Sequence, residues 1–296
     1  MRYKIGVDGG ASKTECILVD AAGKIVARRR TGGCNPNAIG ADEARRVLTE
    51  ALRSLPAKGT ITATLLCMAG SRPFWREFAR GLRGFGRVRA VDDSLPVLEL
   101  ATQGEPGLVL HAGTGSFVAA RTGKAGPGRL GAVHYAGGVG WRLGDPGSGY
   151  DLGRRAIAAA LLEMQGWRPP SRLTPLVRRH TRLKDVAKIT RTFYTVSGAD
   201  PRVPGLVPGL LRLAERGDAS AVAVVAASTA NLLELAVRVA AKLFPGRAPG
   251  SIRAGLSGQI LNHPGVLPML RTRSPLHLAP ISGRPIEGVR RLLAYL

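Results

Sequence analysis

Two glycine-rich turns of similar design occur in this chain, and each is enclosed by apolar runs of strand length. The turns are Asp8–Thr14 and Ala112–Ser116, and each is predicted to be the bend of a β-hairpin. Glycine has no Cβ atom, so its backbone N–H group can approach an anion closely, and nearby hydroxyl groups add further donors. Two such bends in two similar halves predict a polyphosphate ligand.

The segments around these turns repeat one order of strands and helices. The first half predicts strands at Lys4–Val7, Glu15–Val19, Lys24–Arg30, Ile61–Met68 and Val88–Val91 and helices at Asp42–Ser54, Pro73–Leu82 and Leu95–Thr102. After a linker at 103–107, the second half predicts strands at 108–111, 117–121, near 133–135 and at 251–256, and helices at 150–164, 219–244 and 285–296. The chain is therefore predicted to have an α/β fold with two domains, 1–106 and 107–284. The second domain would contain a helical insert at about 166–216, and the last helix, 285–296, would pack on the first domain.

Composition narrows the class of protein. The chain has 296 residues, of which 45% are hydrophobic, and a net charge of +23. Its arginines are spread along the chain and aromatic residues are only 5%, so a solvated basic surface is favoured over a nucleic-acid groove. The longest apolar stretch, 219–244, carries a polar stripe and is predicted to be a core helix. Because the N-terminus enters a strand directly, we expect a cytoplasmic protein.

Cysteine and histidine do not form a metal-binding pattern. The three cysteines are Cys16, Cys34 and Cys67, and no C-x-x-C spacing occurs among them. The five histidines are widely scattered. Buried free thiols are therefore predicted, and neither a zinc site nor an iron–sulfur cluster is supported.

Two other phosphate-binding motifs do not fit this chain. The first turn ends like a Walker A loop, but Ser12 stands where glycine must precede Lys13, and a strand follows in place of a helix. Gly147–Tyr150 does not follow a predicted strand, as a dinucleotide-binding loop would require. Both matches are interpreted as chance.

Five motifs occur in a fixed order along the chain: Gly6–Thr14, Asp92–Ser94, Ala112–Ser116, Gly138–Tyr150 and Leu256–Gln259. Through them the chain is similar to the actin, hexokinase and heat-shock ATPase superfamily and, within it, resembles the BadF/BadG/BcrA/BcrD ATPase and N-acetylglucosamine kinase family. This resemblance implies duplicated ribonuclease H-like (actin-like ATPase) domains with an interdomain nucleotide cleft, and ATP and Mg²⁺ as cofactors.

The resemblance also implies which residues bind the cofactors. Asp8 would hold Mg²⁺ through water. Gly258 would let the adenine lie against the backbone, although a simple turn after a strand is the alternative interpretation. The residues implied to contact the phosphates are Gly9, Gly10, Ala11, Ser12, Lys13 and Thr14 from the first turn and Gly113, Thr114, Gly115 and Ser116 from the second.

Asp93 is the residue that the resemblance implies as the general base. It follows a predicted strand and opens a helix, and it would take the proton from a sugar hydroxyl as that oxygen attacks the γ-phosphate. A helix N-cap is the alternative, and Asp92, Asp93 and Ser94 would all suit it. We favour Asp93 as the base and Asp92 as a cap or neighbour. Two adjacent carboxylates would raise each other's pKa.

The sugar-binding residues implied by the resemblance are Asn35, Ser71, Asp93, Thr114 and Asp145. Asn35 precedes a proline, so a turn-forming asparagine is its alternative interpretation. The chain departs from the family pattern near the sugar, with Val139 in place of tryptophan and Pro146 in place of glutamate.

The sequence therefore predicts an ATP-dependent kinase that phosphorylates a hydroxyl of a hexosamine such as N-acetylglucosamine or glucosamine. The alternative is an ATPase that activates a partner enzyme. That class carries an iron–sulfur cluster bound by cysteines of the second domain, whereas all three cysteines here lie within the first 67 residues. We expect a small sugar and ATP as ligands, no nucleic acid and no membrane, with a homodimer as one assembly.

Overall fold

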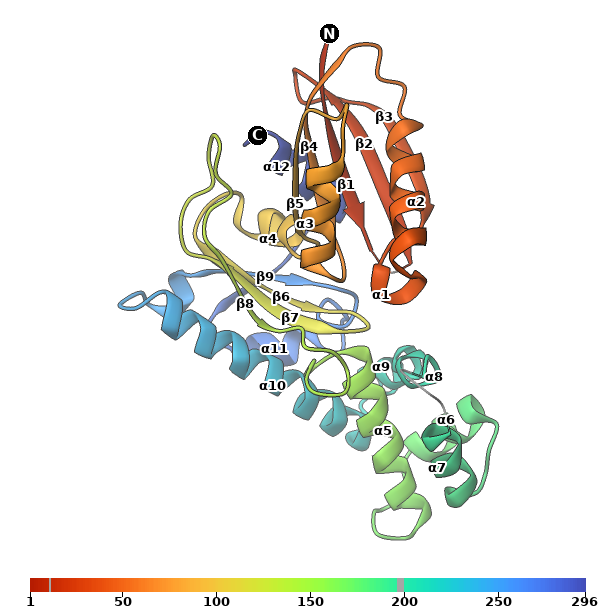
Figure 1. Cartoon of the computed structure of the whole chain (residues 1–296). Helices are drawn as coiled ribbons and strands as arrows, with labels where there is room; N and C mark the ends of the chain where they lie inside the picture. The colour runs from red at the N-terminus through yellow and green to blue at the C-terminus, as the bar shows by residue number, and fades with distance from the viewer. Residues whose placement is uncertain (11, 196–199) are drawn as a thin grey trace. The chain divides into compact units, whose positions relative to one another are not determined.

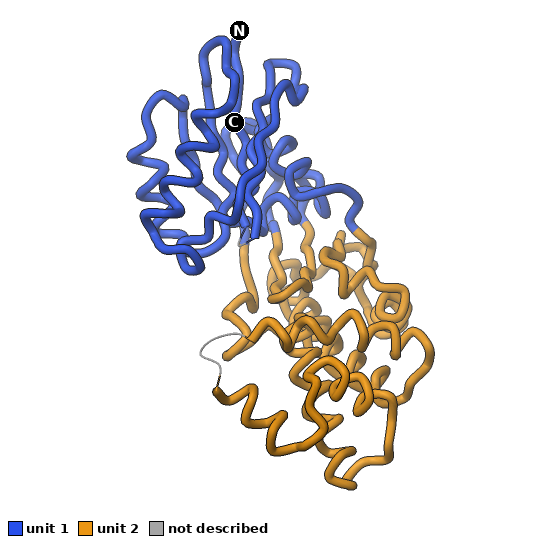
Figure 2. Tube along the Cα trace, turned by 90° about the vertical axis from the view of Figure 1, so that its right-hand side faces the viewer, with its two compact units in different colours: residues 1–106, 121–133, 281–296 blue, residues 107–120, 134–280 orange. Residues whose placement is uncertain are grey.

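The chain forms two compact units, each made of several stretches of sequence. The computed structural model describes residues 1–10, 12–195 and 200–296. Unit 1 comprises Met1–Pro106, Arg121–Val133 and Ile281–Leu296, and unit 2 comprises Gly107–Ala120 and His134–Pro280 (Figure 2). The expected domains, 1–106 and 107–284, are continuous stretches of sequence, and their bounds stay a prediction. In the structure, the segment 121–133 packs with unit 1.

Unit 1 is built on a five-stranded sheet with the order β3-β2-β1-β4-β5. Strands β1 and β2 are antiparallel, as are β2 and β3, whereas β4 is parallel to both β1 and β5. Its strands are β1 (Arg2–Gly9), β2 (Lys13–Asp20), β3 (Ile25–Gly32), β4 (Thr60–Met68) and β5 (Arg87–Asp92). Its helices are α1 (Pro36–Ile39), α2 (Ala41–Arg53), α3 (Arg72–Gly81), α4 (Leu95–Thr102) and α12 (Pro285–Leu293).

Helices cover both faces of this sheet, because the central strands are apolar on both sides. Ile5 and Val7 of β1 belong to a buried cluster with Leu48 of α2 and Trp75 of α3. On the other face, Gly6 lies so close to α12 that an added Cβ would be 2.6 Å from Val289 Cγ1. Helix α12 also packs on α4, and Figure 1 shows α2 and α3 against the sheet. The last helix thus completes the layer opposite α2 and α3.

Unit 2 repeats the same sheet. Its strand order, β8-β7-β6-β9-β10, is the order of unit 1 with each strand replaced by its counterpart, so the predicted duplication is confirmed. Its strands are β6 (Gly107–Ala112), β7 (Ser116–Arg121, whose last residue falls in unit 1), β8 (Val133–Gly137, whose first residue falls in unit 1), β9 (Arg253–Ser257) and β10 (His277–Pro280). Its helices are α5 (Gly149–Met164), α6 (Leu173–Thr181), α7 (Val186–Tyr194), α8 (Arg202–Gly205), α9 (Val207–Glu215), α10 (Ala219–Leu243) and α11 (Leu267–Arg273), with a 3₁₀ turn at Pro249–Ser251.

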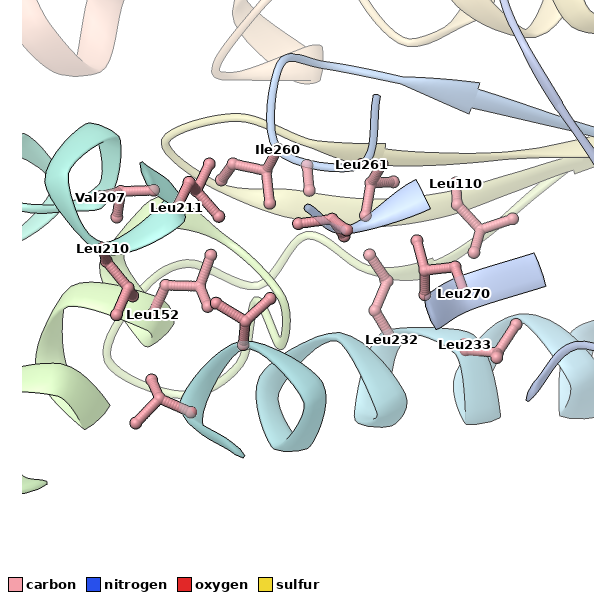
Figure 3. Close-up of a cluster of buried hydrophobic side chains, with 14 of the residues drawn as sticks. Leu110, Leu152, Val207, Leu210, Leu211, Leu232, Leu233, Ile260, Leu261 and Leu270 are labelled. Carbon is pink, nitrogen blue, oxygen red and sulfur yellow. The ribbon is translucent and has the colours of Figure 1, made fainter. Parts of the chain in front are cut away.

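Helix α10 is the core helix of unit 2, as its polar stripe predicted. By length and composition it is the one helix among the described residues that could cross a membrane, and half of its most apolar stretch is buried. Leu232 and Leu233 of α10 lie in the same buried cluster as Leu110 of β6 and Leu270 of α11 (Figure 3). Helices α6, α7, α8 and α9 occupy the sequence of the expected helical insert.

A buried ion pair lies inside unit 1. Glu99 of α4 and Arg121 are 1% and 0% exposed, and Glu99 Oε2 lies 2.7 Å from a guanidinium nitrogen of Arg121. The same nitrogen donates to Thr102 Oγ1 at 3.1 Å, and the Tyr295 hydroxyl donates to Glu99 Oε1 at 3.0 Å. Burying a single charge away from water costs free energy, so each member of the pair offsets the cost of burying the other.

We expect Arg121→Met to lower the free energy of unfolding by about 3–5 kcal/mol, the usual cost of leaving one member of a buried pair without its counter-charge. Adding Glu99→Gln in the same chain should recover part of this loss. Arg46→Met, which removes an exposed arginine that pairs with Glu43 and Glu50, is the control and should have a far smaller effect. Equal losses in urea unfolding of the two arginine variants would contradict this interpretation.

Candidate functional site

Backbone hydrogen bonds connect the first glycine turn to two neighbouring loops. Gly10 N–H donates to the Lys13 carbonyl at 2.9 Å and closes the turn between β1 and β2. Ala69 N–H, directly after β4, donates to the Gly9 carbonyl at 2.7 Å, and Cys34 N–H, after β3, donates to the Gly10 carbonyl at 3.2 Å. The residues that follow these strands are therefore brought to one edge of the sheet.

The side chains of this turn divide into buried and exposed groups. Thr14 is 1% exposed and its hydroxyl donates to Cys34 Sγ at 3.0 Å, so this hydroxyl is engaged within the protein. Ser12 and Lys13 are exposed, and Ala11 lies outside the described residues. The exposed Ser12 and Lys13 side chains of this turn can therefore meet a phosphate, whereas the Gly10 N–H group closes the turn and the Thr14 hydroxyl bonds to Cys34.

Asp8 is the half-buried carboxylate next to this turn. It lies opposite Glu15 of β2 and Cys67 of β4 in the sheet register. Burial raises the pKa of Asp8 to about 6, although Lys13 and Arg284 lower it. The described residues contain no group of three or more His, Cys, Asp or Glu side chains that could hold a metal ion. The role of Asp8 as a metal ligand stays a prediction.

Asp92 and Asp93 lie at the end of β5 in different surroundings. Arg72 Nε donates to Asp92 Oδ2 at 2.8 Å, and the backbone N–H of Ser94 donates to Asp92 Oδ1 at 3.2 Å. The Ser94 hydroxyl also donates to Oδ1. Burial raises the pKa of Asp93 to about 7, followed in effect by the charge of Asp92, a side-chain hydrogen bond with Asp92 and the charge of Asp8. Asp92 is thus the supported neighbour, and Asp93 is a carboxylate able to accept a proton near neutral pH.

Asn35 and Ser71 are brought together at the same edge. Asn35 Oδ1 accepts from Asn37 N–H at 2.9 Å and caps α1, so the turn interpretation of this residue is confirmed. Ser71 is the N-cap of α3. Gly70 has φ +93°, and a Cβ there would lie 2.3 Å from Asn35 Oδ1, so only glycine permits this approach. The Asn35 amide nitrogen is left as a donor.

The edge of unit 1 as a whole is the carboxyl end of its parallel strands. Asp8 is next to last in β1, Ala69 and Ser71 follow β4, and Asp93 follows β5. In open α/β sheets ligands bind beyond this end of the strands. Four of the predicted site residues, Asp8, Asn35, Ser71 and Asp93, are therefore gathered where a ligand is expected.

In unit 2 the second glycine turn lies beside Asp145. Gly113 N–H donates to the Gly115 carbonyl at 2.9 Å and closes the turn. Asp145 has φ +61° and accepts from Gly140 N–H at 3.2 Å, and a Cβ on Gly115 would lie 2.8 Å from its Oδ2. Asp145 is 5% exposed, and burial raises its pKa. This brings Asp145 and the turn together as predicted residues of one site.

The hydroxyl groups of the second turn differ in availability. Ser116 is 2% exposed and donates to the Pro146 carbonyl at 2.6 Å, which engages its hydroxyl within the protein. Thr114 is exposed. Gly258 has φ +92°, and a Cβ there would lie 2.0 Å from the Ala112 carbonyl oxygen. Close backbone packing therefore explains this glycine, and contact with adenine stays a prediction.

His111 and Arg72 are site residues that the sequence analysis did not select. His111 Nδ1 lies 3.0 Å from Ser257 Oγ, and its ring stacks on Phe117 with a centroid distance of 4.9 Å. Burial lowers the pKa of His111 to about 4, so the ring is neutral at pH 7. The position of His111 immediately before the second turn was a usable signal. Arg72 gave none, because its partner Asp92 lies twenty residues away.

The two units share one α/β sheet order, and each has a glycine turn after its first strand. The profile of the BadF/BadG/BcrA/BcrD ATPase family matches residues 5–272, and the chain belongs to that family. A solved structure of a candidate N-acetylglucosamine kinase from Chromobacterium violaceum superposes with a TM-score of 0.73 at 26% identity, covering 99% of both chains.

Two curated relatives are sugar kinases. The chain is 31% identical over 173 residues to an N-acetylmuramic acid/N-acetylglucosamine kinase of Clostridium acetobutylicum, covering 54% of each chain. It is 26% identical over 189 residues to the glucosamine kinase GspK of Vibrio cholerae, covering 61% of this chain and 62% of the relative. The matched stretches thus span little more than half the length of these relatives.

We expect Asp93→Asn to stabilise the protein above neutral pH and to have no such effect in acid. The pKa of the Asp93 carboxyl is about 7 in the folded protein, whereas the ordinary value for aspartate is 3.8. The folded state therefore binds this proton more tightly than the unfolded state does. Stability is therefore lost as the pH rises from about 4 to about 7. At pH 8 the gain should be on the order of 1–3 kcal/mol, and it should disappear near pH 4.

Urea unfolding of the wild type and the variant across this pH range measures the effect. Asp42→Asn, at an exposed position in the first turn of α2, is the matched control and should give no gain at pH 8. A difference between Asp93→Asn and the wild type that does not vary with pH would contradict the raised pKa.

Proposed function

We propose that this chain is an ATP-dependent kinase that transfers the γ-phosphate of ATP to a hydroxyl of a hexosamine such as N-acetylglucosamine or glucosamine. The observation that supports it most is Asp93, a buried carboxylate with a pKa of about 7 that follows β5 at the edge shared with the first glycine turn. Sugar kinases among the relatives point to the same reaction.

In the proposed reaction Asp93 is the general base. A base works best when its pKa lies near the working pH, and the environment of Asp93 supplies that condition. Its carboxylate takes the proton of the sugar hydroxyl as the oxygen forms a bond to the γ-phosphorus. The bond between the γ-phosphorus and the bridging oxygen breaks, and ADP leaves with that electron pair. Asp92 keeps its hydrogen bonds to Arg72 and Ser94 and stays outside the proton transfer.

Phosphate binding would use the exposed Lys13 and Ser12 side chains and backbone N–H groups of the first turn other than that of Gly10, which closes the turn. In unit 2, the backbone N–H groups of Thr114 and Gly115 would be the donors, because that of Gly113 closes the second turn. Mg²⁺ would be held by Asp8, because this ion is commonly bound through one or two carboxylates with water and substrate phosphates in its other positions. When bound, the ion would neutralise charge that develops on the phosphates.

Each unit holds residues proposed to contact a sugar. Asn35 would donate through its amide nitrogen, since its oxygen caps α1, and Ser71 stands next to it across Gly70. In unit 2, Asp145 would accept a hydrogen bond from a sugar hydroxyl. Its carboxylate lies close to Gly115, and the exposed Thr114 directly precedes that glycine in the sequence. Specificity for one hexosamine would follow from this loop, where Val139 and Pro146 replace the residues usual in the family.

An ATPase that activates a partner enzyme is the second candidate function. Such a protein needs reactive cysteines at a cluster, whereas Cys16, Cys34 and Cys67 are all buried in unit 1. Burial raises the pKa of each of these thiols, which favours unreactive cysteines. The kinase is therefore the better supported proposal. We propose a cytoplasmic enzyme and, as its assembly, a homodimer.

We expect ADP release from ATP and Mg²⁺ to depend on an added amino sugar. The test uses glucosamine, N-acetylglucosamine and N-acetylmuramic acid as acceptors and glucose as the comparison sugar. Asp93→Asn is the catalytic control: it keeps the shape of the side chain but cannot take the proton, so kcat should fall by roughly 10²–10⁴-fold while both substrates still bind. ADP release of equal rate without sugar would instead support the partner-activating ATPase.

Removal of the proposed metal ligand should abolish the Mg²⁺ response. Asp8→Asn keeps the size of the side chain but lacks the charge, so we expect phosphoryl transfer to be lost at ordinary Mg²⁺ concentrations, with partial recovery at much higher concentrations. Asp20→Asn, at the last residue of β2, is the control and should leave the Mg²⁺ dependence unchanged. A wild-type Mg²⁺ titration curve for Asp8→Asn would refute the assignment.

A further inference from the structure

Two adjacent carboxylates at the end of β5 have unequal sets of partners. Both oxygens of Asp92 accept hydrogen bonds: Oδ2 from Arg72 Nε at 2.8 Å, and Oδ1 from the backbone of Ser94 at 3.2 Å and from its hydroxyl. The Asp92 side chain is 20% exposed and that of Arg72 is 49% exposed. Asp93, the next residue, has no arginine or lysine among the groups that shift its pKa.

We propose that Arg72 is a positioning residue that gives the two aspartates different roles. It pairs with Asp92 and neutralises the charge of that carboxylate, and thereby leaves Asp93 as the base. The inference rests on the proposed kinase function, because it assigns a task to a residue that need not touch either substrate. Arg72 would act entirely through Asp92.

The local fold explains why Arg72 reaches Asp92. Strands β4 and β5 are parallel, and their register places Met68 opposite Asp92. The chain leaves β4 through Gly70 and enters α3 at Arg72, with Ser71 as the N-cap. Helix α3 packs on β5, so its first residue lies above the end of that strand. The short loop 69–71 thus brings Arg72 from the end of β4 to Asp92 at the end of β5.

Charges around Asp93 show what Arg72 contributes. Asp92 precedes Asp93 in the chain, and Asp8 acts on it from β1; both raise its pKa. From β4 comes Cys67, which is neutral at working pH because burial raises its pKa well above the ordinary value. Arg72 of α3 is the cation that pairs with Asp92. Without it, the full negative charge of Asp92 would act on Asp93 and raise the pKa of the base further.

The sign of the expected change follows. In Arg72→Met a higher pH is needed to ionise Asp93, so the acid limb of the pH profile of kcat/KM should move upward by about half to one pH unit. At a pH well below that limb, this amounts to a loss of about three- to tenfold. In Asp92→Asn one negative charge is removed, so the limb should move to lower pH.

The double variant separates action through Asp92 from any other action. In an Asp92→Asn background Arg72 has no carboxylate to neutralise, so Arg72→Met should add little further shift there. Arg72→Lys, which keeps the charge, should lie close to the wild type. Arg76→Met, an exposed arginine one turn further along α3, is the matched control and should leave the limb in place. A shift of equal size for Arg72→Met with and without Asp92, or no shift at all, would overturn the inference.

A measurement without turnover keeps this test separate from the kinase proposal. The carboxyl carbon of Asp93 can be followed by NMR during a pH titration of the wild type and Arg72→Met. We expect the midpoint of Asp93 to move to higher pH in the variant. If the wild type phosphorylates none of the sugars, the proposed function fails, while the titration still decides whether Arg72 controls the ionisation of Asp93. An unchanged midpoint would overturn the inference even in an active kinase.

Discussion

The hydrogen bonds from Ala69 and Cys34 to the backbone of the first glycine turn support the rest of the site. They connect the turn after β1 to the chain leaving β4 and the chain leaving β3, at 2.7 and 3.2 Å. Gly9 permits this approach, because a Cβ there would lie 2.5 Å from Met68 Cε and 3.0 Å from Cys34 Sγ. Asn35 follows Cys34 directly, and Ser71 is two residues after Ala69. The turn therefore sets the positions of residues that are distant in sequence.

Negative charge at this edge has a cost that matches the proposed chemistry. Asp8 lies near the end of β1, and Asp92 and Asp93 lie at the end of β5, on the other side of β4. Burial raises the pKa of Asp8 and of Asp93, and the charges of Asp92 and Asp8 raise the pKa of Asp93 further. A sheet selected for stability alone would not gather such groups. Arg72 offsets one of the three charges by pairing with Asp92. The remaining two carboxylates are those assigned to the metal ion and to the proton, so the unfavourable charge is concentrated on groups with a proposed function.

The sequence predicted the fold well because its signals are local. Apolar runs on either side of the two turns identified the duplicated sheets, and the polar stripe of 219–244 identified α10 as a core helix. The short elements α1, α11 and β10 were not predicted, since four to seven residues carry too little periodicity. Pairings between distant residues were also beyond the sequence: Thr14 with Cys34, His111 with Ser257 and Arg72 with Asp92 depend on strand register. The partners decide which predicted residues are available to a ligand.

Comparison of the duplicated strands shows how two similar halves acquire different chemistry. Asp8 is next to last in β1 and pairs with Cys67 of β4, while His111 is next to last in β6 and pairs with Ser257 of β9. Unit 1 thus has a carboxylate where unit 2 has an imidazole whose pKa burial lowers to about 4. A carboxylate needs a cation before it can lie near a phosphate, whereas a neutral ring does not repel the anion. The position before the first-strand turn is therefore acidic in unit 1 and uncharged in unit 2, so the two turns are not equivalent toward an anion.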